Sequence, residues 1–152
     1  LHPSAKLQYE QLALVETLAI GCHAVDRAAI QKDETCMVIG AGPIGLAVLE
    51  FVKLIGCRII VVDTQQSRLD FVKKKMGITH LLRPSDKLDE QLREICDGHL
   101  PDVVIDATGS NISMANSFGL VASMGRVVYV GITTSDITFK HPPFHRVEGT
   151  LL

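Results

Sequence analysis

The sequence predicts an α/β domain built on a doubly wound, six-stranded parallel sheet with helices on both faces. Short apolar runs rich in β-branched residues alternate with segments of helical composition that are about 10 to 15 residues long. The run Arg58–Val62 (RIIVV) shows no polar alternation, which is typical of a strand covered on both faces. We therefore expect the strand order 3-2-1-4-5-6 with right-handed crossovers.

The first third of the chain predicts a helix, a strand and a second helix. Residues 8–30 are rich in Leu, Ala and Glu and lack proline, so we expect a helix with a break near Gly21. The β-branched run at 35–39 predicts the first strand. Residues 43–55 predict a helix because proline fits its first turn, and the glycine that follows ends it.

The same alternation continues through the rest of the chain. It predicts strands at 58–62, 79–82, 102–105 and 126–130, helices at 67–76, 86–96 and 112–123, and further extended pieces at 137–139 and 147–152. We expect Asp86 to cap the helix at 86–96, and Ser110 or Asn111 to cap the helix at 112–123.

Composition narrows the class of protein. A chain of 152 residues fits one ordinary domain, which we place at residues 1–152. Hydrophobic residues make up 47% and charged residues 21%, which argues against disorder. The net charge is −2, and no like-charge block exceeds Lys73–Lys75, so neither nucleic acid nor a membrane surface is an expected partner.

The cysteines and the chain ends suggest the context of this domain. The four cysteines include no CxxC pair, which favours the thiols of a cytoplasmic protein over a disulfide framework or a metal site. No signal peptide is visible. Leu1 is not a methionine and the chain stops within an apparent strand, so we expect an excised domain.

Residues 38–51 read VIGAGPIGLAVLEF and place three glycines between the first strand and the next helix. In the dinucleotide-binding Rossmann design, the first glycine permits a tight turn, the second admits a pyrophosphate, and the third lets helix and sheet lie close. Free N–H groups of the first helical turn then face the phosphates. We assign this cradle to Gly40, Gly42, Pro43, Ile44 and Gly45.

An acid follows at the position that this design requires. Asp63 lies at the end of the second strand, where a carboxylate accepts hydrogen bonds from the adenosine ribose hydroxyls. A 2′-phosphate would meet a like charge there, so we favour NAD over NADP. Arg68 is the first cation beyond it and could lie along the ribose edge or serve an NADP phosphate. S-adenosylmethionine sites share the acid and the glycine-rich loop, but without a pyrophosphate they seldom need this tight spacing.

Together these motifs resemble the cofactor domain of the medium-chain dehydrogenase/reductases. The order is VIGAGPIG, Asp63, DVVIDATGS (102–110) and GRVVYVGI (125–132), and VETLAIGCHAVDRA (15–28) looks like the entering helix of the zinc-dependent alcohol, polyol and threonine dehydrogenases. The resemblance implies that Ala107, Thr108 and Gly109 border the adenosine and the nicotinamide ribose. It also implies that Val130, Gly131 and Ile132 line the nicotinamide.

The resemblance also implies what the chain lacks. In these enzymes a separate catalytic domain carries the Cys, His and Glu ligands of a zinc ion that polarises the substrate alkoxide, and hydride passes to nicotinamide C4. That domain is not in this chain. Glu16 matches an acid that can reach the zinc, although Thr17 departs from the usual proline after it. One carboxylate cannot hold zinc alone.

Two features near the C-terminus invite a site or an interface. His141 and His145 have the spacing of a metal pair, but the two prolines between them predict a loop, so we interpret them as ordinary loop histidines. In the resembling family, the extended piece after the fifth strand pairs with its twin. We therefore expect a homodimer or tetramer through an edge strand at 137–139.

We therefore favour the NAD-binding domain of a zinc-type alcohol or polyol dehydrogenase that oxidises a secondary alcohol such as a sugar alcohol, a sugar acid or a threonine-like compound. The chain alone is then expected to bind NAD and catalyse nothing. A zinc-independent NADPH reductase, a non-enzymatic NAD-sensing module and a methyltransferase stay open as alternatives.

Overall fold

The computed structural model describes residues 6–152 and confirms the predicted architecture. Six parallel strands form one sheet in the order β3-β2-β1-β4-β5-β6, as predicted. The first five residues of the expected domain 1–152 lie outside the described part. No helix within residues 6–152 combines the length and the apolar character that crossing a membrane requires.

Most elements lie close to their expected bounds, but the helix expected at 112–123 ends at Ser117, and only Thr150–Leu151 of the extended piece expected at 147–152 form a strand. The strands are β1 (Thr35–Ile39), β2 (Arg58–Val62), β3 (His80–Leu82), β4 (Val103–Asp106), β5 (Arg126–Tyr129) and β6 (Thr150–Leu151). The helices are α1 (Tyr9–Ala13), α2 (Val15–Ala28), α3 (Pro43–Ile55), α4 (Gln66–Phe71), α5 (Leu88–Ile95), α6 (Asn111–Ser117) and α7 (His141–Arg146). A π-helical turn, η1 (Val72–Met76), continues α4.

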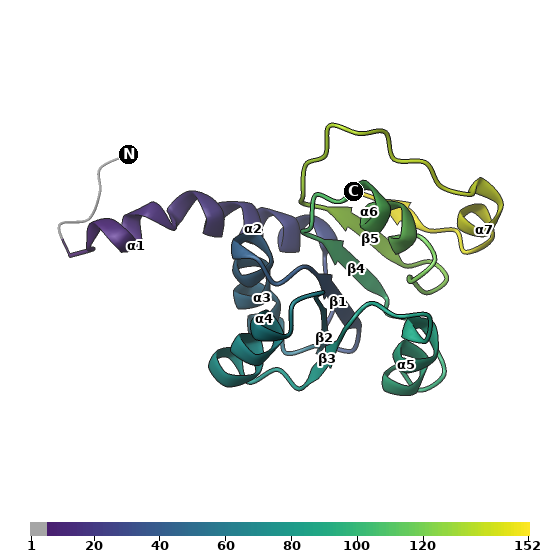
Figure 1. Cartoon of the computed structure of the whole chain (residues 1–152), viewed down its shortest axis with the longest axis horizontal. Helices are drawn as coiled ribbons and strands as arrows, with labels where there is room; N and C mark the ends of the chain where they lie inside the picture. Colours follow the sequence, from purple (N-terminus) through teal and green to yellow (C-terminus); the bar gives the residue numbers. More distant parts are fainter. Residues whose placement is uncertain (1–5) are drawn as a thin grey trace.

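The side chains of the central strands alternate between two hydrophobic clusters, one on each face of the sheet. Along β1, Cys36 and Val38 pack with α2, α3 and η1, while Met37 and Ile39 pack with α5. Figure 1 shows the same division, with α2, α3 and α4 on one side of the sheet and α5 and α6 on the other. Burial on both faces explains why these strands lack polar alternation.

The N-terminal helical segment breaks at Leu14, not near Gly21 as expected. Figure 1 shows α1 and the start of α2 extending away from the sheet. Gly21 lies inside α2, where a Cβ would come within 2.7 Å of the backbone carbonyl carbon of Ala47 in α3. The glycine is therefore required where two helix backbones cross closely, and it does not interrupt the helix.

The two predicted helix caps have different outcomes. Ser110 does cap α6, because its hydroxyl accepts a hydrogen bond from the N–H of Ser113. Asp86 does not cap α5, which begins at Leu88. The Leu88 N–H donates to the carbonyl oxygen of Ser85, so Asp86 lies inside the turn that precedes the helix.

The expected edge strand at 137–139 is wrong. These residues lie outside the strands, and β6 forms the edge of the sheet instead. Phe139 packs within its own chain, with its ring centroid 4.1 Å from that of Phe118. The side chain that was expected to be free for pairing is thus engaged in an aromatic contact. A homodimer or tetramer through this region stays a prediction.

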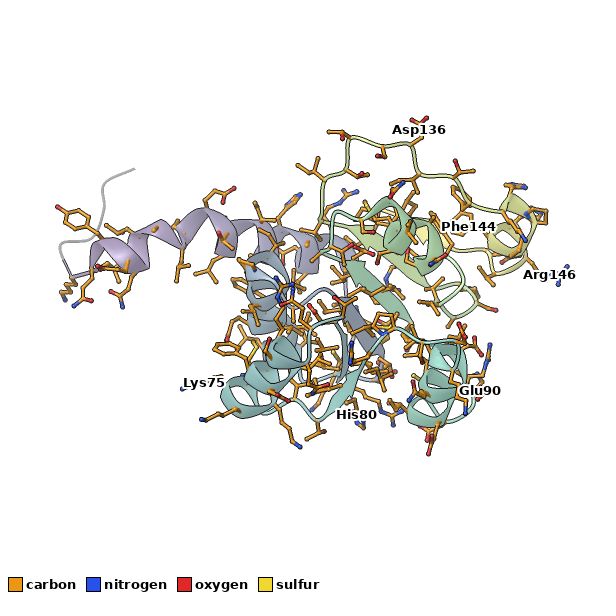
Figure 2. The ribbon with its side chains drawn as sticks, in the orientation of Figure 1. Lys75, His80, Glu90, Asp136, Phe144 and Arg146 are labelled. Carbon is orange, nitrogen blue, oxygen red and sulfur yellow. The ribbon has the colours of Figure 1, made fainter. Side chains whose placement is uncertain are left out.

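Helix α7 also contradicts expectation, because Pro142 and Pro143 were expected to impose a loop. Both prolines lie in the first turn, where a missing N–H removes no helical hydrogen bond. Phe144 points from α7 into the molecule and its ring lies 4.7 Å from that of Phe118, whereas Arg146 points outward (Figure 2). Aromatic packing therefore stabilises a helix that the local pattern alone does not favour.

The i,i+4 relation of His141 and His145 is consequently kept. Both residues are exposed, and their rings stack with centroids 5.5 Å apart. Within residues 6–152, no group of three or more His, Cys, Asp or Glu side chains is placed to hold a metal ion. This pair therefore adds no metal site to the fold.

We expect Gly21→Ala to lower the free energy of unfolding by about 2 kcal/mol, because the new Cβ would force α2 away from α3. Urea denaturation followed by circular dichroism measures the change. Gly119→Ala is the matched control, since a Cβ there would meet only the Asn116 carbonyl oxygen at 3.5 Å. Equal stability of the Gly21 variant and the control would show that the helix crossing is not tight.

Candidate functional site

The parallel sheet brings the carboxyl ends of its central strands to one edge. Ile39 of β1 is in register with Val62 of β2 and with Asp106 of β4, which pairs in turn with Tyr129 of β5. Backbone bonding continues one step further, because the N–H of Gly40 donates to the Val62 carbonyl oxygen at 2.8 Å. The segments that follow these strands, where the sequence predicts ligand contacts, therefore lie side by side.

The turn from β1 to α3 is closed by two glycines in contact. Gly40 has φ +94°, which disfavours any other residue. A Cβ added at Gly45 would lie only 1.7 Å from the carbonyl oxygen of Gly40, and its next neighbour outside the turn is the Cβ of Ala107 at 3.7 Å. The third glycine therefore lets helix α3 start against the turn itself, a closer approach than the predicted one between helix and sheet.

Gly42 differs from these two glycines because it faces open space. It is the N-cap of α3, with an ordinary φ of −77°. The nearest atom to a Cβ added there would be Nη1 of Arg68, 4.0 Å away. Pro43 follows and has no N–H, so the amides of Ile44 and Gly45 are the first that α3 can offer. The loop therefore leaves room for a ligand beside a helix N-terminus.

The Asp63 carboxylate points under the glycine loop. Its Oδ2 accepts from the Ala41 N–H and its Oδ1 from the Gln65 N–H, both at 2.7 Å. Nη1 of Arg68 lies 3.5 Å from Oδ2. A carboxylate offers about four acceptor positions, so one remains for a ligand hydroxyl. Asp63 thus holds the loop as well as closing one end of the groove, which its position in the sequence alone does not indicate.

Arg68 is the more exposed partner of this pair. Its side chain is 44% exposed, whereas that of Asp63 is 3% exposed. The guanidinium therefore reaches solvent at the groove, which Arg68 lines. The cation also offsets part of the negative charge that Asp63 places at the loop.

A groove of about 600 Å³ runs along this edge of the sheet. It is lined by many of the residues expected to contact a cofactor, namely Gly40, Gly42, Pro43, Asp63, Arg68, Ala107 and Thr108. Apolar side chains also line the groove, namely Pro84 and Leu88 before and at the start of α5, and Ile112 and Leu120 in and after α6. Its dimensions and mixed lining suit a small organic ligand.

The other expected contacts lie beyond the walls of this groove. Gly109 and Gly131 bring the loops after β4 and β5 together, because a Cβ at Gly131 would lie 2.3 Å from the Gly109 nitrogen. Val130 lines a second cavity, and Ile132 is 90% exposed. The structure thus groups Val130, Gly131 and Ile132 at the next strand end, adjoining the loop that carries Thr108.

Asp106 is the residue that sequence reasoning missed. It is fully buried at the end of β4. Its Oδ1 accepts from the N–H and the hydroxyl of Thr108 at 2.8 and 2.6 Å, and its Oδ2 accepts from the hydroxyl of Ser113 at 2.5 Å. The aspartate in DVVIDATGS, which ends a buried strand as Asp63 does, was the available signal.

Glu16 does not line this groove. It lies in the first turn of α2 and lines a separate cavity of about 510 Å³ together with His23, Arg27 and Tyr129. Burial raises the pKa of the Tyr129 hydroxyl, which donates to the Met114 carbonyl oxygen. These side chains do not form a zinc site, since the described residues offer Glu16 no second and third ligand.

The cysteines take no part in the groove. All four are free, and Cys36 and Cys96 are buried. Burial raises the pKa of the thiols of Cys36, Cys57 and Cys96, so these groups stay protonated and are poor nucleophiles.

Comparison with known proteins gives concordant matches. Residues 43–152 match the sequence family described as zinc-binding dehydrogenase. L-Galactonate-5-dehydrogenase of Escherichia coli K12 is 37% identical over 150 residues, which cover 99% of this chain and 44% of that protein. Sorbitol dehydrogenase of Bacillus subtilis is 32% identical over 141 residues, covering 91% and 39%. This chain spans less than half the length of either relative.

A solved structure agrees with the fold. An alcohol dehydrogenase from Escherichia coli CFT073, in complex with NADH, matches with a TM-score of 0.88 at 21% identity, over 100% of this chain and 45% of that one. At this identity the likeness supports the fold alone.

We expect Gly45→Ala to lower the free energy of unfolding by about 3 kcal/mol or more, because its Cβ would collide with backbone and not with a flexible side chain. Gly42→Ala should change it by less than about 0.5 kcal/mol, because its φ is ordinary and the space is open. Thermal and urea denaturation measure both variants. Similar losses for the two would contradict the tight turn.

Proposed function

This chain belongs to the zinc-binding dehydrogenase family, and from that premise we propose that it binds NAD and orients the nicotinamide for hydride transfer from a secondary alcohol. The observation that carries the proposal is the open side of Gly42, where the groove meets the start of α3. A pyrophosphate fits there because no Cβ intervenes and the helix N-terminus favours an anion.

The remaining contacts follow the groove in the order of the dinucleotide. Gly40 to Gly45 would hold the pyrophosphate, with amide donors from Ile44 and Gly45. Asp63 would accept from an adenosine ribose hydroxyl, and Arg68 would turn along the ribose edge. Ala107 and Thr108 would border the adenosine and the second ribose. NADH, the nucleotide in the complex of the similar fold from Escherichia coli, is of the type that we propose here.

The segment after β5 would orient the reactive ring. Val130, Gly131 and Ile132 would present backbone groups to the nicotinamide and its carboxamide. NAD, when bound, supplies the hydride acceptor at its nicotinamide C4. The contribution of this chain is to place that ring at the strand edge and to cover one of its faces.

The substrate and the zinc ion would be held mainly by residues outside this chain. The described residues do not fit zinc, so we assign no step to a metal here. Glu16 stays our candidate for a ligand or outer-shell carboxylate in a longer protein. The similarity to L-galactonate-5-dehydrogenase and sorbitol dehydrogenase favours a sugar acid or a sugar alcohol as substrate. The chain alone should bind NAD without turnover.

We expect the chain to bind NADH about tenfold or more tightly than NADPH, because a 2′-phosphate would approach the Asp63 carboxylate. Titration with each nucleotide, followed by nicotinamide fluorescence, measures both dissociation constants. S-Adenosylmethionine should not raise the melting temperature. Binding of NADPH but not of NADH would contradict the role given to Asp63.

We expect Gly42→Ala to weaken NADH binding at least about tenfold while leaving stability unchanged, because its methyl group would occupy the place of the pyrophosphate. The same fluorescence titration measures the loss, and urea denaturation establishes that the variant is folded. Unaltered affinity in a folded Gly42→Ala variant would place the ligand elsewhere.

A further inference from the structure

Asp106 has no role in the binding scheme above, although it is fully buried at the floor of the groove. Its two carboxylate oxygens accept from a backbone N–H and from the hydroxyls of Thr108 and Ser113. Both hydroxyl residues line the groove, whereas Asp106 does not. A buried carboxylate that does not line the groove therefore orients the hydroxyls of two side chains that do.

The hydrogen-bond inventory determines what these hydroxyls can offer a ligand. A hydroxyl has one proton and two lone pairs, and a carboxylate only accepts. Thr108 and Ser113 each give their single proton to Asp106. One lone pair of Thr108 accepts from the Ser110 N–H at 3.0 Å. What remains on the groove side of both hydroxyls is acceptor capacity alone.

We propose that Asp106 is a positioning residue for base recognition: by taking both hydroxyl protons, it turns Thr108 and Ser113 into an acceptor wall that selects the exocyclic amine of adenine. The inference rests on the proposed function, since it concerns the base of the same dinucleotide. It predicts discrimination against a base that carries a keto oxygen in place of that amine.

We place the base beside Ser113, which lies in α6. Thr108 adjoins the glycine loop, because a Cβ added at Gly40 would come within 3.1 Å of its Cγ2. The apolar side chains of Pro84, Leu88, Ile112 and Leu120, which suit a flat ring, line the groove together with the polar residues Ser110 and Asn116. Ribose hydroxyls can donate or accept, so they fit either kind of wall. The exocyclic amine of adenine only donates, so its binding depends on whether the wall offers hydrogen-bond acceptors.

The substitution Asp106→Asn would change the Ser113 hydroxyl from an acceptor to a donor on the groove side. The Thr108 N–H at Oδ1 requires an acceptor, so the amide oxygen must take that side and the amide NH₂ must face Ser113. The Ser113 hydroxyl then accepts from the amide, and its proton is free to point into the groove. A donor now faces the base, which suits a keto oxygen better than an amine.

The test compares NADH with reduced nicotinamide hypoxanthine dinucleotide, which carries the keto oxygen, by fluorescence titration of the 152-residue chain. We expect the unchanged chain to bind NADH about tenfold more tightly than the analogue, from one hydrogen bond made or mismatched. In Ser113→Ala the ratio of the two dissociation constants should fall to about threefold or less. In Asp106→Asn it should fall to about one or invert.

Ser117→Ala is the matched control. The Ser117 hydroxyl is also buried in α6, but it donates to the Met114 carbonyl oxygen and does not line the groove. Its loss should leave the ratio at about tenfold, as for the unchanged chain. A general loosening of α6 would weaken the binding of both nucleotides alike and would leave the ratio of their dissociation constants unchanged. This ratio therefore separates base recognition from a structural effect.

Two outcomes would overturn this inference while leaving the proposed function intact. One is equal affinity of the unchanged chain for NADH and its hypoxanthine analogue. The other is a tenfold preference that persists in folded Ser113→Ala, and this variant decides the matter if Asp106→Asn does not fold. Failure of the unchanged chain to bind either nucleotide would instead contradict the proposed function itself.

Discussion

The contact between Gly45 and the carbonyl oxygen of Gly40 is the constraint on which the rest of the site depends. A Cβ added at Gly45 would lie 1.7 Å from that oxygen, so no side chain fits there and helix α3 can begin directly against the end of β1. That start places Gly42 at the N-cap, with its open side toward the groove. A looser turn would withdraw both the helix N-terminus and its amide donors from the strand edge.

Two buried aspartates hold the loops around this turn. Asp63 follows β2 and Asp106 ends β4, the two strands that flank β1, and each accepts a backbone N–H from two residues further along the chain. Each also binds a more distant group, Asp63 the loop amide of Ala41 and Asp106 the hydroxyl of Ser113. Because their carboxylates are satisfied within the protein, the groove is already shaped before any ligand enters.

The second cavity lies against α2, outside the candidate cofactor groove. Glu16, His23 and Arg27 lie along one face of α2, and α2 crosses α3 at the position that Gly21 makes possible. The helix that would carry a metal-directed acid is therefore packed directly on the helix that starts at the cofactor loop. This packing gives a physical link between the candidate cofactor groove and the cavity that Glu16 lines.

The sequence by itself determined the sheet, the glycine turn and Asp63, because strand burial, backbone sterics and short connections act over a few residues at a time. The tertiary structure decided the use of Gly21, the helix at His141–Arg146 and the engagement of Phe139, since each depends on a residue distant in the chain. Asp106 is a different case, because its hydroxyl partners lie only two and seven residues further along the chain. Its type and place were visible in the sequence, but its hydroxyl partners emerge only when the loop after β4 folds back onto its side chain.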